Sequence, residues 1–313
     1  MISSLVCFRP VGASETIYIQ PDGTISPPTA PIVKNGDNYT ITGDISTNGD
    51  GIVIQRNNTV LDGAGHTVQG ASTPSSGGIR LSEGYQISIK NVRVRAYGSG
   101  ILLDEYSSFN SIRNCTVEAN DYGISCWALS ENNTILGNNV TGNVLSGIWI
   151  AGSANNTIVE NRIVGNGQYG INIESSANCT ICRNNFMSNV DQFHVYDSPS
   201  AWDNGFDGNY WSDYTGSDSN GDGIGDTPRI IDQDNVDRFP LMNPYWAMAD
   251  INHDLRVDMR DVGIVAAAFG TVPGNPKWNP HADITGRFQI PDGAVDMRDI
   301  GAVCGSFGRR YVP

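Results

Sequence analysis

The sequence lacks the features that would place it in several common functional classes. It has no run of about 18 apolar residues, which is the length a membrane-spanning helix requires. It also has no stripe of basic residues, which a nucleic-acid-binding protein needs. Only 17% of its residues are charged, and its formal net charge is −14. We therefore expect neither a membrane span nor a nucleic-acid partner.

The six cysteines do not form a recognisable pairing pattern. Cys7 lies within the first 14 residues, and Cys115, Cys126 and Cys304 are isolated. The lone CxxC at 179–182 has no second pair and no βαβ context, so it is a weak signal for a redox or metal site. Buried free thiols are the expectation.

A repeat of about 23 residues dominates what is present. The chain has 36 Gly and abundant Asn, and 39% of its residues are hydrophobic and recur regularly. Gly-Ile pairs mark the repeat at intervals of 22, 23, 24 and 23 residues; their isoleucines are Ile79, Ile101, Ile124, Ile148 and Ile171. Short strands with turns at fixed offsets and no helical period predict one solenoid coil per repeat.

Aligning the repeats places residues in columns. Two columns are aliphatic or aromatic and should point inward: Ile89, Ile112, Ile135, Ile158 and Ile181; and Val94, Val117, Val140, Ile163 and Phe186. Two more are asparagine columns, which we interpret as structural: Asn138, Asn161 and Asn184; and Asn120, Asn143, Asn166 and Asn189. Stacked amides can hydrogen-bond from coil to coil.

The Gly-Ile strands also predict an outward face, because successive side chains of a strand point to opposite sides. One outward column contains Arg80, Leu102, Ser125, Trp149, Asn172 and His194, and the next contains Ser82, Asp104, Trp127, Ala151, Glu174 and Tyr196. Flat aromatic faces stack on sugar rings, so the carbohydrate-binding candidates are Arg80, Asp104, Trp127, Trp149, Asn172 and Glu174. A covering loop or an assembly surface would also explain two outward Trp.

The same columns give little support for glycoside hydrolysis. That reaction usually needs two carboxyl groups about 5–9.5 Å apart. Asp104 and Glu174 lie three coils apart, which corresponds to about 14 Å. We therefore favour binding over catalysis and expect no catalytic residue in these columns, although acids on other faces would change this.

Clustered acids in the last third of the chain predict Ca²⁺, because carboxylates at alternating positions around a tight turn supply the oxygen ligands of a calcium loop. The first loop has the candidate ligands Asp218, Asn220, Asp222, Ile224 and Asp226. The second has Asp250, Asn252, Asp254, Arg256, Asp258 and Asp261. The third contains an insertion of about five residues and has Asp283, Thr285, Asp292, Ala294, Asp296 and Asp299.

The N-terminal part indicates an extracellular or cell-surface protein. Residues 1–14 look like the end of a secretory leader, with a small-residue cleavage site at Val11-Gly12-Ala13. Asn-X-Ser/Thr sequons begin at Asn38, Asn57, Asn114, Asn132, Asn139, Asn155 and Asn178. They fit a glycosylated exterior protein, although turns rich in Asn and Thr also produce sequons by chance.

The repeats, together with the closing block from Asn209 to Pro228 and the segment Phe239-Pro-Leu-Met242, resemble the NosD-like and CASH families of β-helix proteins. The resemblance implies a right-handed parallel β-helix and a link to carbohydrate. NosD proteins are associated with copper delivery. This chain has only four His, at unrelated positions, and its six Met form no cluster, so it lacks a set of soft copper ligands.

Residues ~248 to 310 resemble a type I dockerin. The segment Val257-Asp-Met-Arg-Asp-Val-Gly263 recurs as Val295-Asp-Met-Arg-Asp-Ile-Gly301, each copy following an Asp-rich loop. The family implies folding on calcium and docking to a cohesin domain. Where it often carries Ser-Thr recognition pairs, this chain has Met259-Arg260 and Met297-Arg298. A structural cap locked by calcium is the alternative.

These observations predict a mainly β protein: a parallel β-helix followed by a small α-helical, calcium-binding, dockerin-like domain. The expected regions are a leader remnant (1–14), an N-terminal strand and cap (15–50), the β-helix (51–197), a closing block with linker (198–247) and the dockerin-like pair (248–313). The favoured function is glycan binding combined with assembly through a cohesin-type partner. A dockerin-tethered polysaccharide lyase or glycosidase and a structural surface-layer protein remain alternatives.

Overall fold

The protein is a parallel β-helix with a small helical module, as seen in a computed structural model that describes residues 15–219, 223–245, 249–252, 256–284 and 293–308. The chain divides into two compact units. The first comprises Met1–Thr157, Asn161–Cys179 and Ser188–Pro199. The second comprises Ile158–Glu160, Thr180–Met187 and Ser200–Pro313. The order of the strands in the three large sheets, given next, confirms the predicted solenoid.

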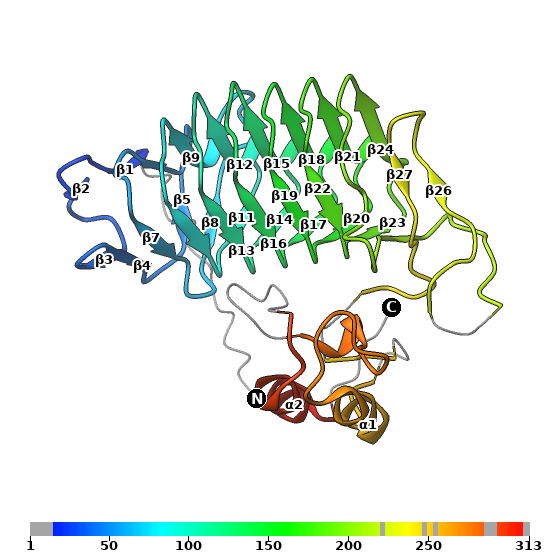
Figure 1. The fold of residues 1–313 in the computed structure, drawn as a ribbon. Coiled ribbons are helices and arrows are strands. Elements are labelled where there is room, and N and C mark those ends of the chain that lie inside the picture. The colour runs from blue at the N-terminus through cyan, green and yellow to red at the C-terminus, as the bar shows by residue number, and fades with distance from the viewer. Residues whose placement is uncertain (1–14, 220–222, 246–248, 253–255, 285–292, 309–313) are drawn as a thin grey trace, which may run out of the picture. The chain divides into compact units, whose positions relative to one another are not determined.

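Each coil contributes one strand to each of three sheets, and the strands stack in order along the solenoid (Figure 1). Sheet I has nine strands in the order β2-β1-β6-β9-β12-β15-β18-β21-β24. Their bounds are β1 (Ile17–Ile19), β2 (Ile25–Ser26), β6 (Ile52–Ile54), β9 (Gly77–Ser82), β12 (Ser99–Asp104), β15 (Tyr122–Trp127), β18 (Ser146–Ala151), β21 (Tyr169–Glu174) and β24 (Asp191–Tyr196).

Sheets II and III have eight strands each. Sheet II contains β3 (Ile32–Asn35), β4 (Asn38–Ile41), β7 (Val60–Asp62), β10 (Ser88–Lys90), β13 (Ser111–Arg113), β16 (Thr134–Leu136), β19 (Thr157–Val159) and β22 (Thr180–Cys182). Sheet III contains β5 (Ile45–Ser46), β8 (Thr67–Gln69), β11 (Arg93–Arg95), β14 (Thr116–Glu118), β17 (Asn139–Thr141), β20 (Arg162–Val164), β23 (Asn185–Met187) and β25 (Tyr210–Trp211).

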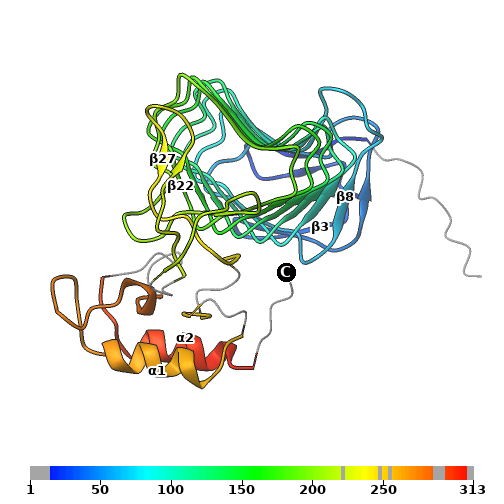
Figure 2. The same cartoon turned by 90° about the vertical axis from the view of Figure 1, so that its right-hand side faces the viewer.

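The coils superpose when viewed along the solenoid (Figure 2), because equivalent residues pair in register. Ile89 pairs with Ile112 and Ile112 with Ile135, and all are fully buried. The column of Val94, Val117, Val140 and Ile163 is buried in the same way. Repeating one aliphatic side chain at one depth gives each coil the same packing surface for the next, which is how a solenoid builds its core.

Ladders of asparagine side chains supply hydrogen-bond partners to the buried polar groups in the turns between sheets. The Oδ1 of Asn143 accepts hydrogen bonds from the backbone N–H and the Nδ2 of Asn120, both at 3.1 Å. Its own Nδ2 donates to Asn166 Oδ1 (3.0 Å) and to the Val117 carbonyl (3.3 Å). The structural interpretation of these asparagines is thereby confirmed. A third ladder, not predicted, runs through Asn110, Asn133 and Asn156.

The N-terminal residues already follow the solenoid pattern. β1 pairs in parallel with β6, β4 with β7 and β5 with β8. The region 15–50, expected as a strand and cap, therefore supplies three parallel partners for the next coil. Four cysteines, Cys115, Cys126, Cys179 and Cys182, are free and buried as expected. Cys304 is free but exposed, so burial was the wrong expectation for it: it lies on a surface helix of the small module.

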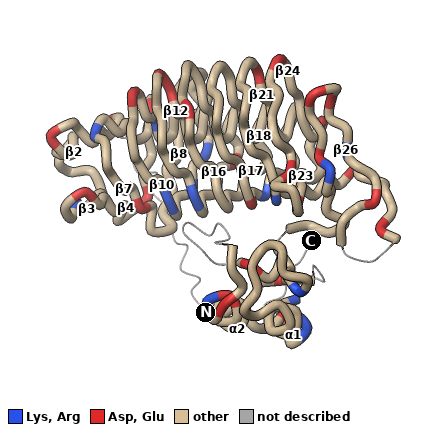
Figure 3. The backbone as a smooth tube through the Cα atoms, in the orientation of Figure 1, with Lys and Arg blue, Asp and Glu red and all other residues tan. Residues whose placement is uncertain are grey.

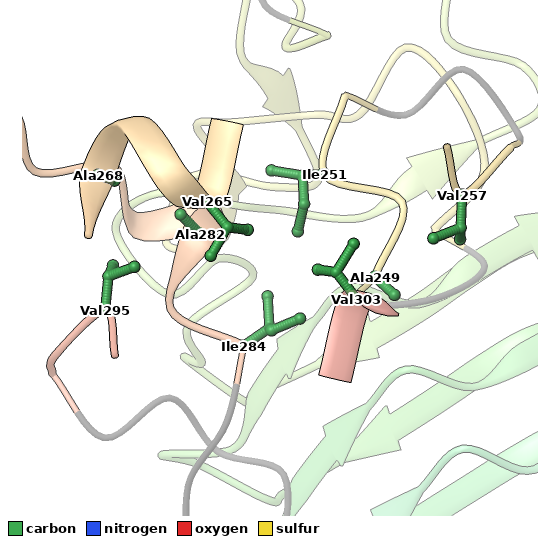
Figure 4. Packing of buried hydrophobic residues seen from close by; sticks show 9 residues of the cluster. All are labelled: Ala249, Ile251, Val257, Val265, Ala268, Ala282, Ile284, Val295 and Val303. Atoms are coloured by element: carbon green, nitrogen blue, oxygen red, sulfur yellow. The ribbon is translucent and has the colours of Figure 1, made fainter. Parts of the chain in front are cut away.

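The second unit ends in a two-stranded sheet and a helical module. The sheet comprises β26 (Arg229–Ile230) and β27 (Val236–Asp237). The module contains α1 (Met259–Ala268), η1 (Pro280–Ala282) and α2 (Met297–Ser306). Its core is small and aliphatic (Figure 4); the buried residues are Ala249, Ile251, Val257, Val265, Ala268, Ala282, Ile284, Val295 and Val303. Among the described residues, no helix is long and apolar enough to cross a membrane.

Candidate functional site

The outer face of sheet I carries the predicted columns in register. In the register of adjacent strands, the first column runs through residues that lie opposite one another: Arg80, Leu102, Ser125, Trp149, Asn172 and His194. In the neighbouring column, Ser82 pairs with Asp104, Trp127 with Ala151, Ala151 with Glu174, and Glu174 with Tyr196. The alignment inferred from the Gly-Ile pairs therefore matches the strand register.

Three aromatic side chains gather on two adjacent strands of this face. The rings of Tyr122 and Trp149 stack at 4.4 Å and 28°. Trp127 meets Trp149 edge to face, with ring centroids 4.7 Å apart. All three side chains are half-buried, and Ser125, which lies between Tyr122 and Trp127 in β15, is fully buried. We call Tyr122, Trp127 and Trp149 the aromatic cluster.

The indole nitrogens of the cluster have unmet hydrogen-bonding capacity. The Nε1 atoms of both Trp127 and Trp149 are shielded from solvent and have no hydrogen-bond partner. An unpaired N–H of this kind costs roughly 1–3 kcal/mol. Such groups are rare in folded proteins, and each calls for an explanation.

A second aromatic contact and a chain of polar groups lie on the next two strands. Tyr169 and His194 stack at 5.0 Å and 28°. The amide of Asn172 bridges two neighbours: its Nδ2 donates to Glu174 (2.8 Å), and its Oδ1 lies 3.0 Å from Nδ1 of His194. Because an amide oxygen can only accept, His194 is the donor in that bond. Glu174, Asn172 and His194 form what we call the polar chain.

Charged side chains in the N-terminal part of the same face form ion pairs with one another. Arg80 lies 3.0 Å from Asp104 and 3.8 Å from Asp50. Arg80 and Asp104, predicted as glycan-binding residues, are thus paired with each other. Asp104 is on β12 and Glu174 is on β21, three strands away in sheet I. This spacing of about 14 Å is too long for a glycosidase carboxyl pair.

Sequence reasoning missed Tyr122 and Tyr169, each of which directly precedes a Gly-Ile pair. The strand bends at the glycine: a Cβ on Gly123 would lie 2.3 Å from the Gly147 carbonyl oxygen and 2.6 Å from Val140. Gly123 and Ile124 therefore both face inward, and strict alternation fails at this point. The signal available in the sequence was an aromatic residue immediately before the marker glycine.

The predicted calcium loops lie only partly in the described chain. Asn220, Asp222, Asp254, Thr285 and Asp292 fall outside the described residues. In the first loop, Asp218 accepts a hydrogen bond from the Gly223 backbone, and Asp226 accepts from the backbone and hydroxyl of Ser219. Within the described ranges, no three His, Cys, Asp or Glu side chains converge to hold a metal ion.

The second and third loops form a duplicated unit with matching contacts. Asp261 accepts a hydrogen bond from the Ile251 backbone, and Asp299 accepts from the Ile284 backbone, both at 2.8 Å. The two copies also bond reciprocally: Gly270 N donates to Val295 O, and Gly308 N donates to Val257 O, again both at 2.8 Å. This correspondence aligns Asp283 with Asp250 and supports the predicted insertion in the third loop.

The donors in these two loops fit an oxygen-seeking cation. Asp250, Asp261, Asp283 and Asp299 are all buried, two in each loop. Burying carboxylates costs free energy unless positive charge or hydrogen bonds compensate. Asp258 and Asp296, predicted as ligands, also cap α1 and α2 through complete capping boxes. Asp261 and Asp299 are the second members of these capping boxes, so helix capping involves four of the predicted ligands and leaves the buried Asp250 and Asp283 outside it.

A buried charge network lies in the second unit, outside the predicted sites. Arg183 donates from Nε and a terminal nitrogen to Asp207 (2.8 and 2.7 Å) and lies 4.0 Å from Glu160. Burial raises the pKa of Glu160 to about 7, against the lowering effect of Arg183. Burial also acts to raise the pKa of Asp207, but Arg183 and His281 together outweigh it and the net shift is downward. Arg183 and His281 thus favour the ionised form of Asp207, whereas Glu160 is the more easily protonated carboxyl.

The described residues do not fit a copper site. His66 lies beside Asp44, His194 stacks on Tyr169 and His281 belongs to η1, so these three histidines do not converge. The thiols of Cys115, Cys126, Cys179 and Cys182 are buried. Burial raises the pKa of Cys115 and of Cys182 to about 12, which disfavours the thiolate that binds metal.

The stacked three-sheet coils and the in-register ladders define a parallel β-helix protein. A family model described as "Periplasmic copper-binding protein (NosD)" matches residues 14–216, and the chain belongs to this NosD family. The NosD-like resemblance predicted from the repeats and the closing block is confirmed. The C-terminal helical module lies beyond the matched residues.

Comparison with solved structures gives matches of low sequence identity and low TM-score. The periplasmic alginate epimerase AlgG is 21% identical with a TM-score of 0.41, covering 46% of this chain and 35% of that one. The Dettilon tailspike protein (gp208) is 22% identical with a TM-score of 0.35, covering 48% and 37% respectively. The chain therefore spans about a third of the length of these proteins, and the likeness concerns the fold alone. No curated protein matches the chain.

Proposed function

We propose that the chain is an extracytoplasmic glycan-binding protein whose binding surface is the outer face of sheet I from β15 to β24. The observation that carries the proposal is the aromatic cluster, a half-buried platform whose two indole N–H groups have no partner. Sugar rings present apolar faces to aromatic rings and hydroxyls to polar neighbours. The polar chain on the adjoining strands supplies such neighbours.

Binding fits this face better than catalysis does. Asp104 is engaged by Arg80 and lies three strands from Glu174, so the two do not form a hydrolytic pair. Arg80 is itself paired with acids, which leaves it poorly placed as the base of a lyase. The periplasmic description of the NosD family supports a location outside the cytoplasm. A tethered polysaccharide lyase remains the alternative function.

A glycan array probed with the full chain tests this function. Trp149→Ala and Trp127→Ala should each weaken any binding detected, by about tenfold, which corresponds to about 1.4 kcal/mol. The matched control is Tyr85→Ala, which removes an exposed aromatic residue that pairs with Phe109 away from the face. Binding that all three variants retain would rule out the face, and product release from the glycan would favour the enzyme.

We further propose that the helical module binds Ca²⁺ and docks to a cohesin-type partner. The four buried aspartates and their matching contacts support the calcium sites. Met259 and Met297 occupy equivalent positions at the starts of α1 and α2, and each is 66% exposed. Exposed apolar side chains repeated on two helices favour an interaction surface over a purely structural cap.

Calcium titration of the full chain, followed by circular dichroism, tests the metal sites. Helical signal should increase as calcium is added to protein that has been stripped with a chelator. An unchanged spectrum together with no heat of calcium binding would contradict them. Pull-down with a panel of cohesin domains, with Met259→Ser/Met297→Ser as the comparison, tests docking separately.

A further inference from the structure

The stacked ring pairs of sheet I repeat at equivalent positions two coils apart. Tyr122 is the first residue of β15, and its partner Trp149 is the fourth residue of β18. Tyr169 is the first residue of β21, and its partner His194 is the fourth residue of β24. Both pairs are inclined at 28°. A shift of two strands along sheet I therefore carries the first pair onto the second.

The distance between the two pairs follows from strand spacing. Two steps of a parallel sheet correspond to about 9–10 Å along the solenoid. This distance is comparable to the length of two sugar rings in an extended chain. In such a chain with alternating ring orientation, every second sugar presents the same face. Two platforms two coils apart would therefore stack on sugars of like orientation.

The strand between the pairs carries small side chains at its flanking positions. Ser146, the first residue of β18, is buried and pairs with Tyr169. Ala151, the last residue of β18, lies between Trp127 and Glu174 in its column. At these two positions β18 therefore places no large side chain between the two ring pairs. An oligosaccharide could pass from one ring pair to the other without meeting a bulky residue there.

The charge of the face selects against acidic sugars. Within the strands of sheet I, all of which are described, Arg80 is the one Lys or Arg, and it is paired with Asp104 and Asp50. Glu174 and Asp191 add negative charge beside the second ring pair. Figure 3 displays Asp and Glu near β12, β21 and β24, whereas Lys and Arg lie near β10 of sheet II. A uronate would meet carboxylates at these platforms without a free cation.

We propose that Tyr122/Trp149 and Tyr169/His194 are two subsites, one disaccharide apart, for an uncharged, extended oligosaccharide that runs along the solenoid axis. This inference rests on the proposed glycan-binding function and names its ligand class. The first subsite is apolar and includes Trp127. The second is polar, because Glu174 of the polar chain occupies the position that Trp127 occupies in the first.

Isothermal titration of the full chain with oligosaccharides of two to six sugars tests the proposal. The probes are neutral β-1,4-linked oligomers of glucose and of N-acetylglucosamine, with oligogalacturonates of equal length for comparison. Affinity for a neutral series should rise about tenfold between two and four sugars, since only the longer chains reach both ring pairs. Oligogalacturonates should bind at least tenfold more weakly than the neutral series.

Substitutions at the second subsite test the two-subsite proposal separately from the proposed glycan-binding function. Tyr169→Ala should reduce affinity for the tetrasaccharide to that for the disaccharide, whereas Tyr169→Phe, which keeps the ring, should retain the increase with length. Unfolding temperature and circular dichroism check that each variant is folded. A length-independent affinity, or an increase that Tyr169→Ala preserves, would overturn the two subsites while leaving glycan binding in place.

The remaining outcomes are also distinguishable. Tighter binding of oligogalacturonates than of the neutral oligomers would overturn the ligand class. Absence of binding to every neutral and acidic oligomer would overturn this inference, and an empty glycan array would in addition remove the proposed function itself.

Discussion

The β-helix and the helical module solve the same problem, the burial of polar groups, in opposite ways. In the β-helix, the amides of buried asparagines accept from one coil and donate to the next, so each ladder satisfies itself. In the described part of the module, the buried polar groups include four aspartates, and nine buried hydrophobic residues form a small core. Neutral amides need no counter-ion, whereas buried carboxylates need hydrogen bonds or positive charge to compensate them. From this comparison we expect the solenoid to keep its fold without calcium and the module to depend on it.

Removing calcium should separate the two regions most strongly. A chelator should abolish the helical signal of the module and leave the β-helix folded, since calcium that binds only the folded state adds about 4 kcal/mol at a thousand times its Kd. Circular dichroism with and without chelator measures this. If both regions melted together, or neither changed, the contrast would be wrong.

Arg183→Met should produce the next largest effect. The substitution leaves Glu160 buried without its cation and Asp207 with His281 as its remaining basic partner, and breaking a buried ion pair costs about 3–5 kcal/mol. Denaturant unfolding would measure the loss of stability. The control is Arg93→Met, which removes a half-exposed ion pair with Glu118 and should cost less than about 1 kcal/mol. Equal losses in the two variants would argue against a buried network.

Asn143→Ala should break one ladder in the β-helix. It removes four side-chain hydrogen bonds and leaves the buried Asn120 backbone N–H without its acceptor, at a cost of about 2–4 kcal/mol. Asn155→Gly is the control, because Asn155 is exposed in a left-handed turn that glycine also adopts. Amide exchange and thermal unfolding compare the two. A harmless Asn143→Ala would mean that the ladders are dispensable.

Glu160→Gln should have the smallest effect. It should change how the free energy of unfolding depends on pH. Burial raises the pKa of Glu160 to about 7 in the folded state, so the folded protein binds the extra proton between pH 4.5 and 7. Its contribution to stability is full below pH 4.5 and is lost as pH rises towards 7. The variant should flatten this decline in the free energy of unfolding. A smaller slope should persist, because burial also raises the pKa of Asp237, to about 6. An unchanged slope would contradict the assignment.

Much of the solenoid could be predicted from the sequence, because every coil repeats the same requirements. The Gly-Ile spacing fixed the strand register, and with it the alignment of Trp149 with Asn172 and of Ala151 with Glu174. The ladders followed from asparagines that recur in columns. These features depend on local pattern and on one neighbouring coil, both of which are visible in a single chain.

Other features depended on geometry that the pattern does not contain. Tyr122 and Tyr169 were missed because the strand bends at the glycine and strict alternation fails there. The Arg183 network was missed because its members come from two coils and the closing block, where the repeat ends. The calcium ligands Asn220, Asp222, Asp254, Thr285 and Asp292 stay predictions, as they lie outside the described residues.

The most direct test of the glycan-binding face is the indole N–H region of the NMR spectrum during titration with a neutral β-1,4-linked hexasaccharide. We expect the signals of Trp127 and Trp149, assigned by Trp→Phe substitution, to shift as a sugar ring packs against their indoles. The signals of Trp202 and Trp211, which are buried and already donate to Asn235 and Asp237, should stay in place. Saturable binding that leaves Trp127 and Trp149 unshifted would contradict this expectation.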